Sequence, residues 1–317
     1  MRVCVIAGGV GAARLLHGMQ DAVAPADLTA VVNVADDEQI FGLAVSPDLD
    51  TVVYTCAEAI DTDRGWGLRD ETWRAMESLR RYSRAAGRPD IGWFNLGDQD
   101  LGTHMWRTTR LAQGAALSEV TTEIARAWGL GFTVLPVTDH RVATRLRTVD
   151  GDELAFQEYF VRDHHDVAVD RVRFVGADLA APAPGVVEAI DSADVVVIAP
   201  SNPVVSIGPV LAVPGVREAV VAARERCVAV SPIIGGRALK GPADRLLAEL
   251  GGEPTARGVA EWYQEVASAI VVDHEDEALA PAIEELGLRC HVTATVMTDR
   301  QAAARLARDC IAVATMA

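Results

Sequence analysis

The sequence is short of positive charge. It carries 29 Lys and Arg residues against 45 Asp and Glu, which gives a formal net charge of −16 over 317 residues. Binding along a nucleic-acid backbone normally requires the opposite sign, so we expect no nucleic-acid partner. An anionic small molecule could still bind, but only at a local positive site or through a metal ion.

Cysteine and long apolar runs are also scarce. The five cysteines are scattered and form no Cys-x-x-Cys pair, which argues against a disulfide framework and against a zinc ribbon. No run of about 18 uncharged apolar residues is present, so we expect no membrane span, and the first residues do not resemble a signal peptide. We therefore expect a cytoplasmic protein. Half of its residues are apolar, which is enough to form a large core.

The pattern of apolar runs predicts an α/β fold. Residues 2–7 read as a strand, 8–11 as a glycine loop, 12–20 as a helix and 28–34 as a second buried strand. Such alternation is typical of a doubly wound, mostly parallel, Rossmann-like sheet. Strand-like runs that alternate with helical ones return in the second half of the chain, at 171–175, 195–199, 227–230, 270–273 and 290–293.

The middle of the chain breaks this alternation. Residues 68–86 have the periodicity of a helix, and Ser118 is a candidate cap for another. Two β-rich runs flank Asp150-Gly151, a strong hairpin signal. We therefore expect a single α/β domain over 1–317, with a helical and hairpin insertion at about 57–168.

The loop after the first strand is a candidate anion site. Gly8, Gly9, Val10 and Gly11 would expose backbone N–H groups at a helix N-terminus, where an anion is favoured. The loop is not a P-loop, because no Gly-Lys-Ser/Thr follows. It departs from a dinucleotide fingerprint as well, because Arg14 replaces the third glycine. A guanidinium there could pair with a phosphate, although a tight turn without a ligand remains an alternative.

Four carboxylates follow the second predicted strand. Asp36, Asp37, Asp48 and Asp50 lie just beyond its carboxyl end, where α/β sheets place their ligands. Oxygen ligands suit Mg²⁺, which would let an acidic protein hold a diphosphate. The alternative is that these side chains are solvated loop residues.

Two further loops continue the same edge of the predicted sheet. Ser201 and Asn202, between two prolines, follow the strand at 195–199 and offer short polar groups. Residues 231–236, with Lys240 after them, repeat the pattern at the next strand end. Serial loops of this kind indicate one cleft, although each could equally be a mere turn. Asp98 could cap a helix, and His104 alone is most simply structural.

Together these motifs resemble the CofD/FbiA family of transferases, which makes the deazaflavin coenzyme F420. Their order and spacing match over nearly the whole chain. One departure is Gln99, where many relatives are expected to carry Arg. The segments that carry the resemblance are Ala7 to Arg14, Val32 to Asp37, Ser46 to Thr51, Arg64 to Gly67, Leu96 to Asp100, Phe156 to Tyr159, Ala199 to Pro209 and Ser231 to Gly236.

The resemblance implies a Mg²⁺-dependent phosphotransferase. Members of the family move a phosphorylated three-carbon acid from a guanosine diphospho-linked donor to Fo (7,8-didemethyl-8-hydroxy-5-deazariboflavin), and GMP is released. The terminal ribityl hydroxyl of Fo attacks the phosphorus that bears the acid. The donor carries 2-phospho-L-lactate in archaeal members and an enolpyruvyl group in actinobacterial ones. The sequence does not decide among lactyl, enolpyruvyl and glyceryl donors.

The resemblance also implies residue roles, and it implies a homodimer. Mg²⁺ is expected on Asp36, Asp37 and Asp48, Fo on Asp50 and Asn95, and the catalytic carboxylates are Asp50 and Asp48. The donor is expected on Gly8, Gly9, Val10, Gly11, Arg14, Ser201 and Asn202. Two alternatives are a regulatory protein that binds a nucleotide-sugar without turnover and an NAD-dependent oxidoreductase with Asp36 on the ribose.

Overall fold

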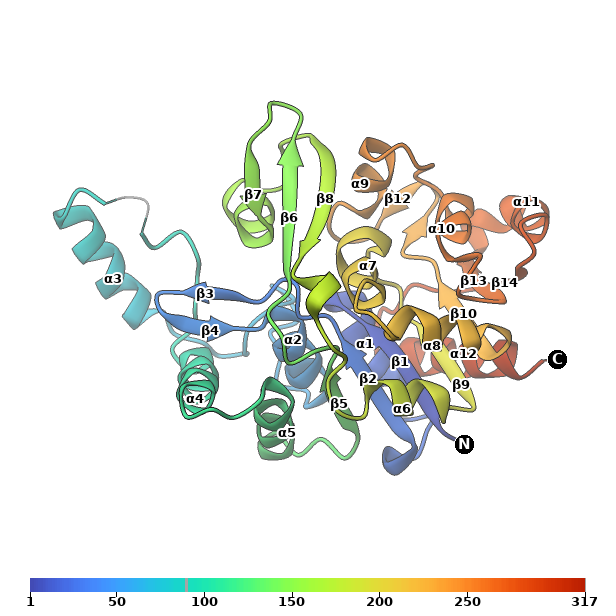
Figure 1. Cartoon of the computed structure of the whole chain (residues 1–317), viewed down its shortest axis with the longest axis horizontal. Helices are drawn as coiled ribbons and strands as arrows, with labels where there is room; N and C mark the ends of the chain where they lie inside the picture. The colour runs from blue at the N-terminus through green and yellow to red at the C-terminus, as the bar shows by residue number, and fades with distance from the viewer. Residues whose placement is uncertain (89–90, 317) are drawn as a thin grey trace.

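A seven-stranded parallel sheet forms the centre of the computed structural model, which describes residues 1–88 and 91–316 (Figure 1). Every neighbouring pair is parallel, and the central strands are buried on both faces, as their continuous apolar runs predict. The predicted doubly wound α/β fold is confirmed. In spatial order the strands are β14 (Arg289–Thr293), β13 (Ala269–Asp273), β10 (Cys227–Val230), β9 (Val195–Ile198), β1 (Val3–Ala7), β2 (Leu28–Val32) and β5 (Thr133–Pro136).

The strand order reverses between β1 and β9. From β1 the chain proceeds to β2 and β5 on one side, then returns to β9 and continues through β10, β13 and β14 on the other. The loops that leave the carboxyl ends of β1 and β9 therefore diverge. Such a switch point opens a crevice where α/β proteins bind ligands.

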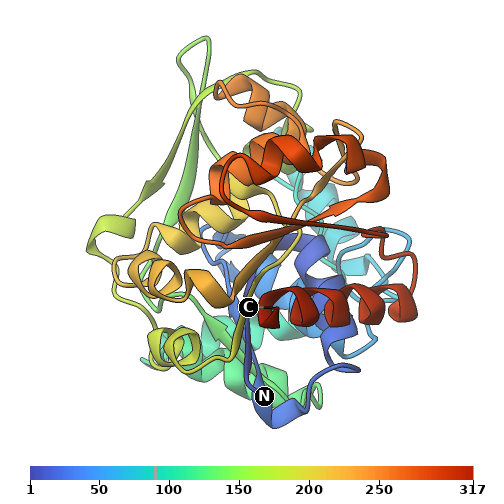
Figure 2. The same ribbon diagram turned by 90° about the vertical axis from the view of Figure 1, so that its right-hand side faces the viewer.

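Helices cover both faces of the sheet (Figure 2). On one face α1 (Gly9–Met19) packs between α2 (Pro47–Cys56) and α12 (Arg300–Thr315). On the other face α6 (Val186–Asp191) packs against α8 (Val216–Ala222). Right-handed crossovers explain this arrangement, because the chain winds in opposite directions from the switch point.

The region expected as one insertion is divided. β5 lies within 57–168, yet it pairs with β2 at the edge of the central sheet. The expected strand at 171–175 is present but does not join the central sheet. As β8 (Val169–Val175) it pairs antiparallel with β6 (Ala143–Thr148), which also pairs with β7 (Glu153–Ala155) across the expected hairpin turn. The reason is the composition of β8, whose Arg171 and Arg173 could not be buried in a central parallel strand.

The predicted helix at 68–86 begins later, at Arg74. Asp98 accepts hydrogen bonds from the backbone N–H groups of Arg74 and Ala75, each at 3.0 Å, and so caps this helix from a distant loop. Ser118 does not cap the helix that begins at Leu117, because it lies inside that helix and bonds to Asp139. The helices of this region are α3 (Arg74–Ala85), which extends away from the sheet in Figure 1, α4 (Asp100–Ala112) and α5 (Leu117–Ala127).

Shorter elements complete the chain. They are β3 (Glu38–Ile40), β4 (Leu43–Val45), β11 (Ile233–Ile234), β12 (Arg237–Ala238), α7 (Gly208–Leu211), α9 (Ala243–Glu249), α10 (Ala256–Tyr263), α11 (Ala280–Glu284), the 3₁₀ segments η1 (Pro25–Asp27), η3 (Ala177–Leu179), η5 (Arg224–Arg226) and η6 (His274–Leu279), and the π-helical segments η2 (Glu158–Arg162) and η4 (Pro203–Ile207).

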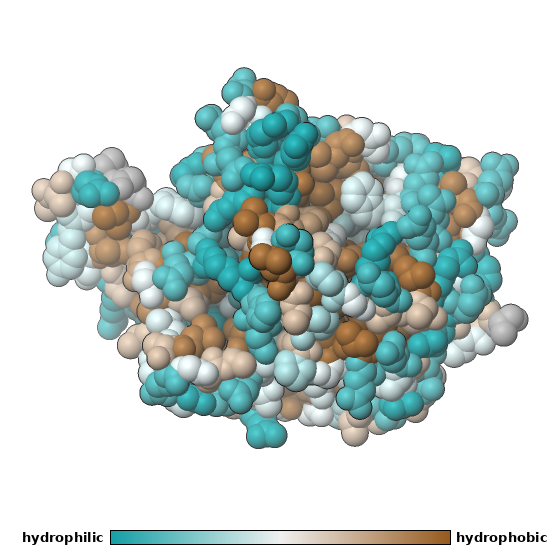
Figure 3. Space-filling model, viewed as in Figure 1, coloured by the Kyte–Doolittle hydropathy of each residue, from teal (hydrophilic) through white to brown (hydrophobic). Residues whose placement is uncertain are grey.

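Apolar residues on the face shown in Figure 3 occur as separate patches among hydrophilic ones. Within 1–88 and 91–316, no single helix is long and apolar enough to cross a membrane. One bent pair, Pro203–Leu211 with Val216–Ala222, meets the length and composition requirements together.

Candidate active site

A cleft of about 680 Å³ opens at the carboxyl edge of the sheet, over the switch point. Its walls come from the loops after β1, β2, β9, β10 and β14, and from the region between α2 and α4. The structure thus brings together segments from both halves of the chain. All predicted site residues except Asp37 line this cleft, namely Gly8, Gly9, Val10, Gly11, Arg14, Asp36, Asp48, Asp50, Asn95, Ser201 and Asn202.

The glycine loop is shaped by close backbone contacts. Gly9 has a φ of +73°, a conformation that L side chains rarely adopt. A Cβ on Gly11 would lie 2.2 Å from the carbonyl oxygen of Pro200, and one on Gly8 would lie 3.0 Å from an oxygen of Asp48. Glycine therefore allows the loop after β1 to touch the loop after β9 across the switch point.

Asp48 holds this loop in place. Its Oδ1 accepts a hydrogen bond from the N–H of Gly9 at 2.8 Å, and its Oδ2 accepts one from Asn33 Nδ2 at 2.9 Å. One N–H at the N-terminus of α1 is thus already bonded to a protein carboxylate. Other N–H groups of that first turn lack carbonyl partners within the helix and remain suited to an anion. Burial raises the pKa of Asp48 to about 6.

Asp36 is a buried carboxylate whose hydrogen-bonding capacity is only partly satisfied. Only 5% of it is exposed, and its Oδ1 has no hydrogen-bond partner among the residues that the structure describes. Burial, followed by the nearby charge of Asp48, raises the pKa of Asp36 well above its ordinary value. Asp37 also has an Oδ1 without a hydrogen-bond partner in the described ranges, but its Oδ2 accepts a hydrogen bond from Ser46 Oγ at 2.6 Å and it does not line the cleft. Burial raises its pKa as well.

These carboxylates fit a magnesium ion better than a metal with an all-protein ligand set. No group of three His, Cys, Asp or Glu side chains in the described ranges could hold a metal by itself. Mg²⁺, however, is commonly held by one or two carboxylates together with water and substrate phosphates. Asp36 and Asp48 meet that requirement, since both line the cleft and the charge of Asp48 raises the pKa of Asp36.

Asp50 belongs to a buried polar network that the sequence analysis missed. Both of its carboxylate oxygens accept hydrogen bonds from Arg107, one of them at 3.1 Å. His104 Nδ1 lies 3.7 Å from Asp50, and its Nε2 lies 3.3 Å from Asp100. Tyr54 donates a hydrogen bond to Asp100 at 2.7 Å. The network fixes the orientation of Asp50 at the wall of the cleft.

A signal for this network is present in the sequence. Asp100, His104 and Arg107 are spaced by four and three positions, which places them on one face of α4. That face meets Asp50 on α2, but the meeting depends on tertiary packing. Although burial opposes ionisation of Asp100, the nearby His104 ring and the hydrogen bond from Tyr54 help to hold its pKa below the ordinary value.

Aromatic side chains line part of the cleft. Trp66 and Phe94 are among them, whereas Trp73 packs edge-to-face against Trp66 with 6.0 Å between ring centroids. Arg64 lies over both tryptophan rings. Phe156 and Phe160 line the cleft from the β7–η2 region. An apolar aromatic surface is thus available beside the polar groups.

Three of the remaining predicted residues have individual roles. Asn95 is exposed, and its side-chain oxygen accepts a hydrogen bond from Arg80. The side-chain oxygen of Asn202 accepts from the N–H of Val204 at 2.9 Å and so caps η4. Ser201 is buried, and within 1–88 and 91–316 nothing hydrogen-bonds its hydroxyl.

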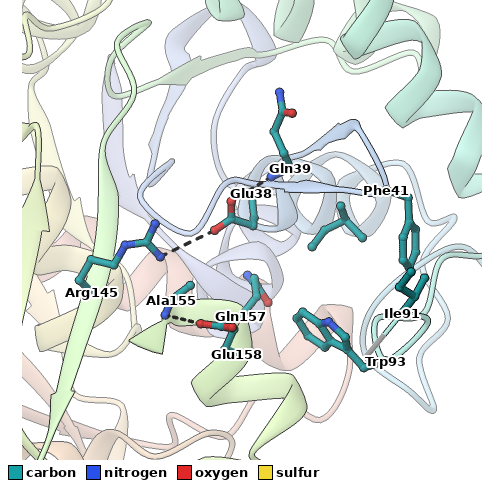
Figure 4. A pocket seen from close by; sticks show the side chains of 10 residues that line it. Glu38, Gln39, Phe41, Ile91, Trp93, Arg145, Ala155, Gln157 and Glu158 are labelled. Atoms are coloured by element: carbon teal, nitrogen blue, oxygen red, sulfur yellow. Dashed lines mark hydrogen bonds and ion pairs between the residues drawn. The ribbon is translucent and has the colours of Figure 1, made fainter. Parts of the chain in front are cut away.

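A second hollow of about 450 Å³ lies beside the β3–β4 hairpin (Figure 4). Its polar groups largely bond to one another. Arg145 lies 3.9 Å from Glu38, and Glu158 accepts a hydrogen bond from the N–H of Ala155. Gln157 borders both cavities and donates to the backbone oxygen of Asp36 at 3.1 Å. Gln157 thus connects the lining of this hollow to the backbone that carries Asp36.

Comparisons with known proteins identify relatives of the whole chain. The chain is 45% identical over 319 residues to the phosphoenolpyruvate transferase of Kitasatospora aureofaciens, covering 99% of this chain and 98% of that one. It is 42% identical to the enzyme of that name in Mycolicibacterium smegmatis, covering 97% of each. A solved UPF0052-family structure from Bacillus halodurans shares the fold, with a TM-score of 0.62 at 17% identity over 98% of each chain.

The family match settles which of the three interpretations of the sequence is favoured. The model described as 2-phospho-L-lactate transferase CofD matches residues 3–316, nearly the whole chain. Neither the nucleotide-sugar-binding regulator nor the NAD-dependent oxidoreductase is favoured by these findings. The chain therefore belongs to the CofD family of transferases, which acts in coenzyme F420 biosynthesis.

Proposed function

We propose that this protein transfers enolpyruvyl phosphate from a guanosine diphospho-linked donor to Fo and releases GMP. The observation that carries the proposal is the composition of the cleft. A glycine loop at a helix N-terminus, two buried carboxylates and an aromatic wall share one cavity. The names of the relatives at 42–45% identity favour the enolpyruvyl donor over the lactyl one.

The donor binds along the switch point in this proposal. Its phosphates meet the first turn of α1 beside Gly9 and Gly11, with Arg14 one turn further along. Ser201 supports the proposal, because a buried hydroxyl without a protein partner is available to a ligand. Fo binds along the aromatic wall, with Asp50 and Asn95 as polar contacts.

The reaction balances as a simple displacement at phosphorus. An oxygen of the ribityl chain of Fo forms a new bond to the phosphorus that bears the three-carbon acid, while the bond from that phosphorus to GMP breaks. The hydroxyl proton passes to a carboxylate or to water. Asp48 and Asp50 are the candidate acceptors, and the bonds of Asp50 to Arg107 hold it in one orientation for the incoming hydroxyl.

Asp36 and Asp48 are the proposed holders of Mg²⁺, with Asp37 behind them. When bound, the ion would neutralise charge on the diphosphate oxygens. The unpaired oxygen of Asp36 supports this role. The homodimer expected from the family resemblance stays a prediction, which sedimentation equilibrium can test.

An activity assay that compares three donors tests the proposal. Purified protein, Mg²⁺ and Fo are mixed with the guanylated enolpyruvyl, lactyl or glyceryl donor, and products are separated by mass. The enolpyruvyl donor should give GMP and a phosphoester of Fo in equal amounts, faster than either other donor. Absence of both products with all three donors would refute the proposal.

A further inference from the structure

Lys240 is the one lysine in the chain, against 28 arginines, and it lies in the cleft. It belongs to the loop between β12 and α9, which leaves the second half of the sheet. The roles proposed for the other residues of the cleft do not involve it. A lone ammonium group in a ligand cleft is a candidate for a role that the numerous arginines do not fill.

The side chain of Lys240 reaches across the cleft to the other half of the chain. Its Nζ lies 3.4 Å from the carbonyl oxygen of Arg64. A Cβ on Gly65 would lie only 2.0 Å from the same nitrogen, so the ammonium rests directly on the backbone of Gly65. The contact joins segments 176 positions apart and spans the loops on both sides of the cavity.

This bridge is weak as a protein contact. A single long hydrogen bond to a carbonyl uses one of three ammonium protons, and Lys240 is exposed. Among the residues that the structure describes, no carboxylate lies within ion-pair distance of Lys240 or of Arg14. Both cations thus stay uncompensated in a chain with a net charge of −16.

The two cations act on one another. Partial burial and then the charge of Arg14 lower the pKa of Lys240. Two like charges at one cavity destabilise the empty site, and an anion placed between them would relieve the repulsion. Arg14 projects from α1, one turn beyond the glycine loop, so this anion would lie next to phosphates bound at that loop.

We propose that Lys240 and Arg14 form an anion subsite that holds an oxyanion of the donor, and that Lys240 exchanges the carbonyl of Arg64 for this ligand. The inference rests on the proposed function, because it assumes that the cleft takes an anionic donor. The oxyanion is either the diphosphate or the carboxylate of the three-carbon acid, since both offer the same charged oxygen atoms.

Amine labelling tests the subsite directly, because only Lys240 and the N-terminus carry aliphatic amines. The full-length protein is acetylated with a limiting amount of an N-hydroxysuccinimide ester, and peptide mass spectrometry compares Lys240 with Met1. Met1 precedes the amino end of β1, away from the cleft, and serves as the internal reference. GDP, phosphoenolpyruvate and the guanylated enolpyruvyl donor are added in separate arms.

Protection of Lys240 but not of Met1 by a saturating ligand supports the subsite. Protection by GDP assigns it to the diphosphate. Protection by the complete donor without protection by GDP assigns it to the carboxylate. Equal labelling of Lys240 with and without every one of these ligands, at concentrations where calorimetry shows binding, would overturn the inference.

Affinity measurements provide the second readout. Lys240→Met should weaken binding of the protecting ligand about tenfold or more, and Lys240→Arg should restore most of it. Arg217→Met removes the same charge from the exposed surface of α8, outside the cleft, and should leave affinity unchanged. If the wild type turns over donor and Lys240→Met binds it equally well, the subsite is wrong while the proposed function stands. If the wild type binds neither GDP nor the donor, the subsite and the proposed function are both wrong.

Discussion

At the scale of single residues, the cleft is distinguished by buried carboxylates. Asp36 has an oxygen without a protein partner, Asp48 is bonded to backbone and amide, and Asp50 is paired with a guanidinium. Three residues of one type thus have three environments within a single cavity. The sequence predicts their proximity from their place after β2, but it does not predict these partners, because Asn33 and Arg107 meet them only through folding.

Asp36→Asn should affect stability and activity in opposite directions. The amide removes a buried charge that is repelled by Asp48, so the metal-free protein should become more stable by about 1–2 kcal/mol. Turnover should fall about 100-fold or more, because the site loses a ligand and a charge. Denaturant unfolding and steady-state kinetics measure the two effects, and exposed Asp178→Asn is the control. Full activity of Asp36→Asn would remove this residue from the site.

Arg107→Met should destabilise the protein by about 3–5 kcal/mol, because it leaves Asp50 buried and without its partner. The double variant Arg107→Met/Asp50→Asn removes both charges and should recover part of this loss. Urea unfolding of the wild type and the two variants gives the comparison. A cost below about 1 kcal/mol for Arg107→Met would show that the pair does not hold Asp50.

At the scale of elements, the glycine loop and the loop after β9 form one unit. Their contact through Gly11 and Pro200 explains why the glycine is needed even where no ligand touches it. Sequence reasoning predicts this loop well, because a strand, a glycine turn and a helix follow one another locally. It predicts β8 poorly, because the partner of a strand is a long-range property that short apolar runs do not contain.

Gly11→Ala should weaken GDP binding at least tenfold while changing Fo binding much less. The added methyl group would collide with the carbonyl oxygen of Pro200 and displace the loops on the donor side of the cleft. Gly102→Ala is the matched control, because that glycine lies in α4 and, apart from its chain neighbours and the backbone of its own helix, no heavy atom lies within 4 Å of the added Cβ. It should keep both affinities and stabilise the helix by about 0.5–1 kcal/mol. Equal losses for GDP and Fo in Gly11→Ala would indicate general misfolding instead.

At the scale of the whole molecule, stability should depend on pH and on Mg²⁺ together. Burial raises the pKa of Asp48 from 3.8 to about 6, and that of Asp36 also rises. At a pH between the unfolded and the folded pKa of Asp48, the folded state retains a proton that the unfolded chain has released. The free energy of unfolding therefore falls as the pH rises through this interval. Mg²⁺ favours the ionised carboxylates and should offset this loss.

Calorimetry with and without MgCl₂, from about pH 4 to about pH 7.5, checks this dependence. The rise in Tm on adding Mg²⁺ should grow with pH and should shrink strongly in Asp36→Asn. A Tm shift that is equal at every pH, or equal in the variant and the wild type, would contradict the assignment of Mg²⁺ to these carboxylates.

The overall fold is the level at which the sequence is most informative. The order of strands and helices on either side of residues 57–168 predicts the parallel sheet and hence the edge where Asp36, Ser201 and Lys240 gather. The division of the middle region by β5 is not predicted, because its short strand resembles other β-rich runs nearby.

The most direct test of the central claim follows one oxygen atom through the reaction. Fo labelled with ¹⁸O at its terminal ribityl hydroxyl is incubated with the protein, Mg²⁺ and the guanylated enolpyruvyl donor, and both products are analysed by mass spectrometry. Attack of this hydroxyl on phosphorus predicts that the label stays in the phosphoester of Fo and that the GMP is unlabelled. A phosphoester of Fo that has lost the label, or GMP formed without a phosphoester of Fo, would contradict the account.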